Sequence, residues 1–200
     1  MKVSNAKMVT VVSGLPRSGT SMMMQMLKAG GMPVITDNIR VADPDNPLGY
    51  YEFEPVKQLS RDASWLDSAG NKAVKIIYRL LYDLPRHHVY KVIFMRRKLE
   101  EVIASQREML RRQNKEGGAL SDRQLADAFR SDMQKIDLWL SGRENFVTLH
   151  VNYDDVLHEP RRTITEIDRF LGYKLDTEAM IKVIDQALHR QRVGAVGAPP

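Results

Sequence analysis

Residues 9–21 read VTVVSGLPRSGTS, a β-branched apolar run that changes abruptly into a loop with two glycines, Gly14 and Gly19. An apolar stretch at helical spacing follows, from Met22 to Leu27. β-branched runs favour strands, and a glycine-containing loop between a strand and a helix is typical of α/β proteins. The segment therefore predicts a strand, a tight loop and a helix at the start of an α/β fold.

The loop has the composition of an anion-binding site. Its glycines let the backbone wrap closely around an anion, and the helix behind it offers unpaired N–H groups and the positive end of its dipole. Ser18, Thr20 and Ser21 add hydroxyl donors. The glycine spacing is that of a Walker A loop, but Thr20 stands where that motif requires lysine, and Arg17 supplies a cation from inside the loop. We predict that this loop binds a phosphate or sulfate group.

Further strands and helices alternate along the chain. Apolar runs typical of buried strands occur at Ala73–Ile77, Tyr90–Met95 and Phe146–Val151. Helical periodicity occurs over about residues 99–110, 125–140, 164–171 and 177–188. Ser121 and Gln124 form a potential capping box for the second of these helices, and Gly172 is a suitable end for the third. The pattern predicts a three-layer α/β P-loop fold, in which helices flank a mostly parallel sheet.

Composition limits the class of protein. The 200 residues suit one domain spanning 1–200, and no stretch reaches the roughly 18 apolar residues of a membrane span. Because the chain has no cysteine and no signal-peptide pattern, we expect a cytoplasmic protein with no membrane partner. Its net charge of +5 suits an anionic ligand, but no zinc-finger spacing or RNA-binding aromatic pattern accompanies that charge, so we expect no nucleic-acid partner.

A polar segment, residues 36–49, has no usable period and is rich in Asp and Pro. A long loop inside a compact domain is often a lid or binding loop. Tyr50 and Tyr51 follow it, and these side chains either line an acceptor pocket or cover an edge of the core.

Three segments together resemble the PAPS-dependent sulfotransferase family. GLPRSGTS (residues 14–21) resembles the 5′-phosphosulfate loop of that family. Arg97 and Ser105, eight positions apart, resemble its 3′-phosphate motif, although Leu99 replaces the usual proline. A strand-end guanidinium and a hydroxyl two helical turns along can converge on one phosphate. VNYDDVLHEPRRTITEIDRFLGYKLD (residues 151–176) resembles the C-terminal segment of the family, with Tyr153 at the position near the adenine.

The resemblance implies the cofactor 3′-phosphoadenosine 5′-phosphosulfate (PAPS), the product PAP, and no bound metal. The cofactor-binding residues that it implies are Gly14, Pro16, Arg17, Ser18, Gly19, Thr20, Ser21, Arg97, Ser105 and Tyr153. Arg192, Gly194 and Gly197 have the spacing of the family's C-terminal cofactor lid, but Val193 replaces its lysine, and we interpret this match as chance.

The same resemblance implies catalytic residues. Lys75, in AVKII, occupies the place of the lysine in the family's K-x-H motif, but Ile77 replaces the histidine, so the general base must come from elsewhere. Glu52, where the chain leaves the polar segment, is our preferred candidate. Glu54 and Asp37 are the alternatives, and in the tyrosylprotein and heparan sulfotransferases the base lies nearer the position of Asp37.

These roles fit the chemistry of sulfuryl transfer. A hydroxyl or amine of the acceptor attacks sulfur in line, and negative charge builds up on the leaving nucleotide. Arg17 and Lys75 would stabilise that charge while Glu52 takes the acceptor's proton. The acceptor, whether a small molecule, a carbohydrate or a peptide, is not indicated by the sequence.

Each assignment has an alternative. Lys75 could be a strand-end lysine that reaches water, Glu52 a surface carboxylate, and Arg97 the partner of a structural Asp or Glu. A P-loop small-molecule kinase that uses ATP and Mg²⁺ would need the missing Walker lysine and a strand-end carboxylate, for which only Asp154 or Asp155 is available. The second rival is a non-catalytic nucleotide-binding protein.

The histidines show no metal-binding spacing with carboxylates, so we interpret them as structural or surface residues and predict no metal site. They are His87, His88, His150, His158 and His189.

Overall fold

Five strands form one parallel sheet in the computed structural model, which describes residues 8–37, 39–43, 46, 49–114, 120–172 and 174–184. The strands are β1 (Val9–Gly14), β2 (Val34–Ile35), β3 (Ala73–Lys75), β4 (Tyr90–Arg96) and β5 (Phe146–Asn152). Their order in the sheet is β2-β3-β1-β4-β5, and every pairing is parallel. The four predicted strands are confirmed, whereas β2 was not predicted because two residues carry no readable pattern.

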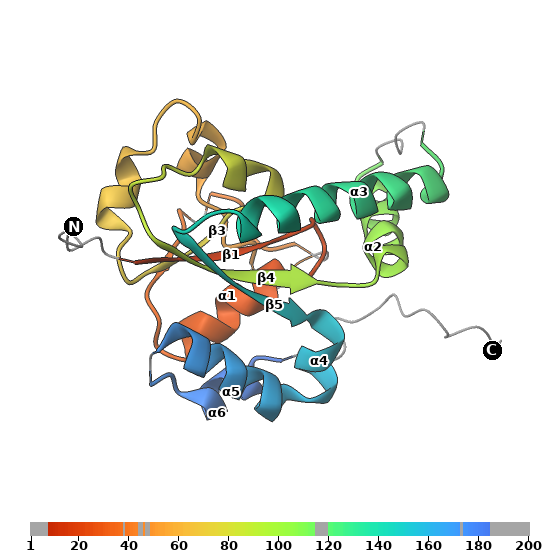
Figure 1. Ribbon diagram of the computed structural model, residues 1–200. Helices are drawn as coiled ribbons and strands as arrows, with labels where there is room; N and C mark the ends of the chain where they lie inside the picture. The colour runs from red at the N-terminus through yellow and green to blue at the C-terminus, as the bar shows by residue number, and fades with distance from the viewer. Residues whose placement is uncertain are drawn as a thin grey trace.

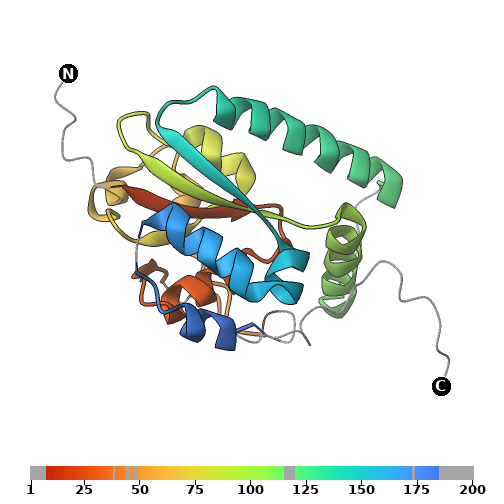
Figure 2. The ribbon, with the colours of Figure 1, turned by 60° about the horizontal axis from the view of Figure 1, so that its bottom comes forward.

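Helices cover both faces of the sheet, as Figures 1 and 2 show. On one face lie α2 (Leu99–Arg112) and α3 (Asp122–Ser141), together with the 3₁₀ turns η1 (Glu54–Gln58), η2 (Ser64–Ser68) and η3 (Tyr78–Asp83). On the other lie α1 (Thr20–Ala29), α4 (Tyr153–His158), α5 (Pro160–Leu171) and α6 (Thr177–Lys182). The predicted three-layer α/β fold with a parallel sheet is therefore confirmed.

Alternation along the strands divides the core into two parts. In β1, Val11 packs with the side of α2 and α3, whereas its neighbour Val12 packs with α1 and α5. In β4, Phe94 and Met95 divide in the same way. Because successive side chains of a strand point to opposite faces, the continuous apolar runs in the sequence mark strands that are buried on both sides.

Two of the predicted helix ends are confirmed, and a third prediction, for the end of the last helix, is wrong. The Ser121 hydroxyl accepts the N–H of Gln124 at 3.3 Å, while Gln124 Oε1 accepts the N–H of Ser121 at 2.9 Å, which completes the capping box of α3. α5 ends at Gly172 with a left-handed φ of 68°. The last helix ends at Lys182 rather than near residue 188, because the N–H of Ile184 bonds to the carbonyl of Ile181 in a tighter turn. None of the described helices is long and apolar enough to cross a bilayer.

A parallel sheet brings the carboxyl ends of all its strands to one edge. Gly14 ends β1, Lys75 ends β3, and Arg96 ends β4 with Arg97 directly after it. Tyr153 follows β5 as the first residue of α4. Residues far apart in the sequence therefore meet at this edge, which is where open α/β sheets usually bind their ligands.

Candidate functional site

The loop between β1 and α1 is tightly wound. Gly14 and Gly19 have φ values of 146° and 96°, and Arg17 is a non-glycine residue with a left-handed φ of 70°. A Cβ on Gly14 would lie 2.6 Å from Ser18 Oγ, so only glycine fits there. The Ser18 hydroxyl donates to the carbonyl of Leu15 at 2.7 Å and is buried. Ser18 therefore shapes the loop and does not face the cavity beside it.

The amino end of α1 faces that cavity. Its first turn carries no acidic side chain, and Thr20 and Ser21 lie at its beginning as residues that line the cavity. The N–H groups of a first turn have no partner within the helix, and the helix dipole gives this end a partial positive charge. The arrangement suits an anion, as the sequence predicts.

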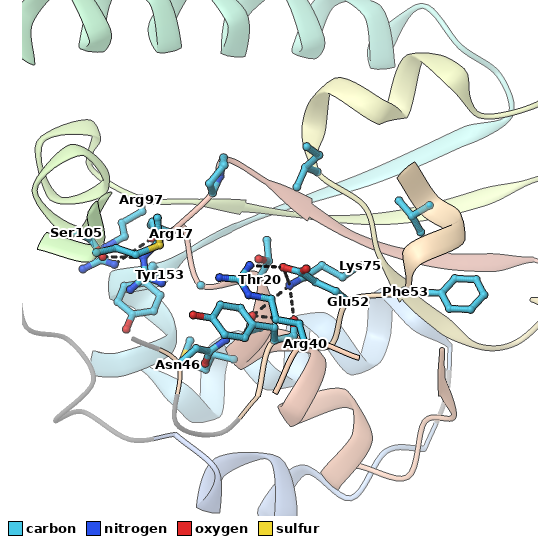
Figure 3. A pocket seen from close by; sticks show the side chains of 18 of the residues that line it. Arg17, Thr20, Arg40, Asn46, Glu52, Phe53, Lys75, Arg97, Ser105 and Tyr153 are labelled. Atoms are coloured by element: carbon cyan, nitrogen blue, oxygen red, sulfur yellow. Dashed lines mark hydrogen bonds and ion pairs between the residues drawn. The ribbon is translucent and has the colours of Figure 1, made fainter. Parts of the chain in front are cut away.

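A second group of predicted residues meets beside the loop, at the left of Figure 3. Arg17 Nε donates to Ser105 Oγ at 2.9 Å, and Arg97 Nη1 donates to the carbonyl of Arg17 at 3.1 Å. The guanidinium carbon of Arg97 lies 4.5 Å from the centre of the Tyr153 ring. The loop, the end of β4, α2 and the start of α4 thus contribute to one cluster of cationic and polar side chains.

A buried carboxylate holds Arg97 in this cluster. Arg97 Nε donates to Glu101 Oε2 at 3.0 Å, and the side chains are only 7% and 2% exposed. A charge at this depth needs a partner, which Glu101 provides one helical turn along. The alternative in which Arg97 pairs with an acidic residue is thus realised, and it is compatible with anion binding because Arg97 also lines the cavity. The i, i+4 spacing in the sequence was the available signal for Glu101.

A third group surrounds Lys75 (Figure 3). Lys75 Nζ donates to the carbonyl of Tyr50 and lies 3.4 Å from Ser21 Oγ and 3.6 Å from Glu52 Oε1. Burial lowers the pKa of Lys75 to about 8, although the carboxylate of Glu52 acts in the opposite direction. The side chain is 9% exposed, so Lys75 does not extend into water. It remains largely protonated at pH 7.

Arg40 is a member of this group that the sequence did not indicate. Arg40 Nη1 donates to Glu52 Oε1 at 2.9 Å, and its guanidinium lies 3.4 Å from the centre of the Tyr50 ring. The Tyr50 hydroxyl in turn donates to the carboxylate of Asp43 at 2.8 Å. Arg40 and Asp43 come from the polar segment that was predicted to be a lid or binding loop, and composition alone could not say which of its residues reach the site.

The two alternative bases lie elsewhere. Asp37 accepts the N–H groups of Glu54 at 2.6 Å and Ile39 at 3.0 Å, and these bonds hold its pKa below the usual value. Glu54 pairs with Lys57 at 2.6 Å on the surface. Neither carboxylate lines the cavity, whereas Glu52 does. Tyr50 also lines it, while Tyr51 packs against the core beside α1.

One cavity of about 480 Å³ joins the groups. The predicted residues that line it are Pro16, Arg17, Gly19, Thr20, Ser21, Glu52, Lys75, Arg97, Ser105 and Tyr153. Residues that the sequence did not single out include Arg40, Asn46, Val56, Lys57, Leu80, Glu108, Met109 and Arg112. Six arginine and lysine side chains face two carboxylates in this lining, so its charge suits a polyanion. Arg192, Gly194 and Gly197 lie outside the described residues.

The sequence and the structure were compared with those of known proteins. A family model described as the sulfotransferase domain matches residues 8–191. No curated protein matches the chain.

Three solved structures illustrate the shared fold. The sulfotransferase domain of an olefin synthase from Synechococcus PCC 7002 is 18% identical, with a TM-score of 0.54, over 100% of this chain and 83% of that one. A mouse sulfotransferase in complex with PAP is 16% identical, with a TM-score of 0.53, over 90% of this chain and 63% of that one. A sulfotransferase from Mycobacterium tuberculosis H37Rv is 17% identical, with a TM-score of 0.51, over 87% of this chain and 70% of that one.

The packing at Gly19 predicts a specific effect of adding one methyl group. A Cβ there would lie 2.5 Å from Tyr153 Cδ2, whereas a Cβ on Gly31, which has a similar φ of 93°, would meet nothing within 4 Å. We expect Gly31→Ala to cost only the backbone strain of about 1–2 kcal/mol, and Gly19→Ala to cost more because the ring must also move. Thermal unfolding of both variants, with and without inorganic pyrophosphate, measures the difference. Equal destabilisation, or equal stabilisation by pyrophosphate, would contradict the packing argument.

Proposed function

The chain belongs to the sulfotransferase domain family, and from this premise we propose that it transfers the sulfuryl group of PAPS to a hydroxyl or amine of a small-molecule acceptor. One observation supports the proposal above the others. Ten residues that were selected from the sequence, nine of them by resemblance to the family and Glu52 by its place after the polar segment, line a single cationic cavity, although they come from five separate segments of the chain. Residues from separate segments that had no common function would not be expected to line the same cavity.

The cofactor has a natural orientation in this cavity. We propose that the 5′-phosphosulfate lies against the loop and the amino end of α1, near Arg17, Thr20 and Ser21. The 3′-phosphate would lie at Arg97 and Ser105, since a planar guanidinium and a hydroxyl suit phosphate oxygens. The adenine would lie near Tyr153, whose ring already faces the Arg97 guanidinium.

The reaction needs positive charge beside the leaving oxygen and a base beside the acceptor. As the new bond from the acceptor oxygen or nitrogen to sulfur forms, the bond from sulfur to the 5′-phosphate oxygen breaks, and PAP leaves with the added charge. Lys75 and Arg17 stabilise that charge, and Glu52 accepts the proton of the acceptor. Glu52 lies 3.6 Å from Lys75, so base and cation are within reach of one reacting centre.

The apolar part of the lining favours an acceptor with an apolar body. Val56, Ile77, Leu80 and Met109 line the cavity, and Ile77 is 41% exposed although it is a large apolar residue. Exposed apolar side chains in a cavity are usually covered when a ligand binds. We therefore propose a phenol or alkyl alcohol in preference to a strongly polar sugar.

A kinase activity has less support. Asp154, which could have held Mg²⁺ after β5, pairs with Lys98 at 2.8 Å, and Asp155 accepts from Asn152 at 3.0 Å. Neither residue lines the cavity. Among the residues of the lining, the carboxylates are Glu52 and Glu108, and Glu52 is paired with two cations.

Nucleotide binding tests the cofactor assignment first. We expect PAP to raise the Tm of the protein without any metal, and to raise it by several degrees at a hundredfold excess over Kd. Arg97→Ala and Arg17→Ala should each abolish most of this shift, because each removes a cation that meets a phosphate. The same titration with ATP and Mg²⁺ is the comparison. Stabilisation by ATP with Mg²⁺ alone would overturn the proposal in favour of a kinase.

Substitutions of Glu52 and Glu54, two carboxylates close together in the sequence, test the catalytic assignment. We expect Glu52→Gln to lower the rate of sulfuryl transfer by a factor of roughly 10² to 10⁴ while the stabilisation by PAP is retained. Glu54→Gln, which changes a carboxylate outside the cavity, is the matched control and should leave the rate unchanged. Transfer from radiolabelled PAPS to a panel of 2-naphthol, 1-octanol and glucosamine gives the rate. PAP binding without transfer to any acceptor in the wild type would favour the non-catalytic alternative.

The lowered pKa of Lys75 predicts a pH dependence. Lys75 is cationic below its pKa of about 8 and loses its proton above it, so kcat/KM should fall as the pH rises beyond that value. Lys75→Arg keeps the charge to much higher pH, and we expect this decline to disappear in the variant with the same acceptor. An identical decline in both proteins would show that another group causes it.

A further inference from the structure

Three potential metal ligands meet near the amino ends of the strands, at the edge of the sheet opposite the cationic cavity. Asp67 belongs to η2, and His87 and His88 belong to the turn that precedes β4. One ligand atom from each of the three lies within 4.8 Å of the others. The sequence did not indicate this group because Asp67 is distant from the histidine pair along the chain, and only the fold places η2 beside the turn.

The distances in this group fit a tetrahedral ion. Two ligands at Zn–N and Zn–O bond lengths of about 2.1 Å lie roughly 3.4 Å apart when they occupy two corners of a tetrahedron. His88 Nε2 and Asp67 Oδ1 are 3.4 Å apart, which is long for a hydrogen bond and equal to this edge. The ring centres of His87 and His88 lie 4.4 Å apart, and each ring has a nitrogen within 4.8 Å of the other two ligand atoms.

We propose that Asp67, His87 and His88 bind a zinc ion, with water at the fourth position. Two imidazole nitrogens and one carboxylate oxygen are a ligand set that zinc accepts, whereas Mg²⁺ and Ca²⁺ prefer sites made of oxygen alone. Asp67 and His87 are exposed, so their side chains can rotate to close the remaining distance and admit the water. Nickel and copper ions share this preference for imidazole.

His88 is the rigidly held ligand of this group. Its side chain is 11% exposed and its ring faces that of Tyr90 at 6.2 Å. Its backbone carbonyl accepts from Asn145 Nδ2 at 3.1 Å, and Leu66, next to Asp67, is 1% exposed in the core. Packing therefore anchors His88 and the backbone beside Asp67, which lowers the entropy that metal binding must overcome.

The role of this ion is structural. The ligands lie before β3 and β4, at the amino ends of the strands, whereas the cationic cavity lies at the carboxyl ends and includes none of the three. The ion links η2 to the turn before β4 and so stabilises the folded state, because binding to the native protein alone raises its free energy of unfolding. It is independent of sulfuryl transfer.

Thermal unfolding of tag-free, chelator-treated protein tests the proposal. We expect Zn²⁺ to raise the Tm saturably, by about 5–10 °C at a hundredfold excess over Kd, with one ion bound per chain by competition with a chromogenic zinc indicator. His87→Ala and Asp67→Asn, both at exposed positions where folding is tolerant, should lower the affinity for zinc about tenfold or more. Mg²⁺ should have no effect.

His158→Ala is the matched control, since His158 is an exposed histidine on α4 and away from this group. It should leave the zinc response unchanged, and PAP binding should be the same in His87→Ala as in the wild type. Absence of a saturable response in the wild type, or a response that survives either substitution, would overturn the proposal. These outcomes do not bear on the cofactor site, because PAP binding is measured separately.

Discussion

The ring of Tyr153 packs against Gly19 so closely that no side chain fits between them, and much of the site depends on this contact. Gly19 lies at the end of the loop after β1, and Tyr153 is the first residue after β5. The same ring faces the guanidinium of Arg97, which follows β4. One aromatic ring thus fixes the relative positions of three segments that end at the same edge of the sheet. The glycine is needed for its left-handed φ and also for the space that the ring occupies.

Positive charge in this site is held by two different means. Arg97 has a buried carboxylate partner in Glu101, and the pair lies deep enough to keep the guanidinium in one orientation. Lys75 lies beside Glu52 at a longer distance and donates to the Tyr50 carbonyl, and burial lowers its pKa to about 8. A rigid, planar arginine suits the recognition of a phosphate, whereas a buried lysine offers a compact point charge. This difference is consistent with the separate roles that we propose for the two residues.

The two ends of the parallel sheet differ in the kind of residue that they gather. The carboxyl ends collect cations and hydroxyls around a cavity, while the amino ends collect Asp67 and the two histidines at the surface. The central strands β1 and β4 are buried over most of their length, and among the described residues the strands contribute to the two groups only at their ends. Because the two groups lie at opposite ends of the strands and share no residue, we expect a substitution in one to leave the other largely undisturbed. Stability and chemistry can therefore be measured separately in this protein.

The sequence by itself determined the strand-loop-helix unit, the parallel α/β fold and ten of the residues that line the cavity. These depend on local patterns: apolar runs for β1, β4 and β5, the two glycines of the loop, and the capping box of α3. Only the tertiary structure decided that Glu52 lines the cavity while Asp37 and Glu54 do not, that Arg40 joins Glu52, and that Asp67 lies beside two histidines. Such contacts join segments that are distant in the sequence, and they arise from the order of the strands and the path of the connecting loops. The path of the loops depends on which side chains the whole chain buries, and a short stretch of sequence does not contain that information.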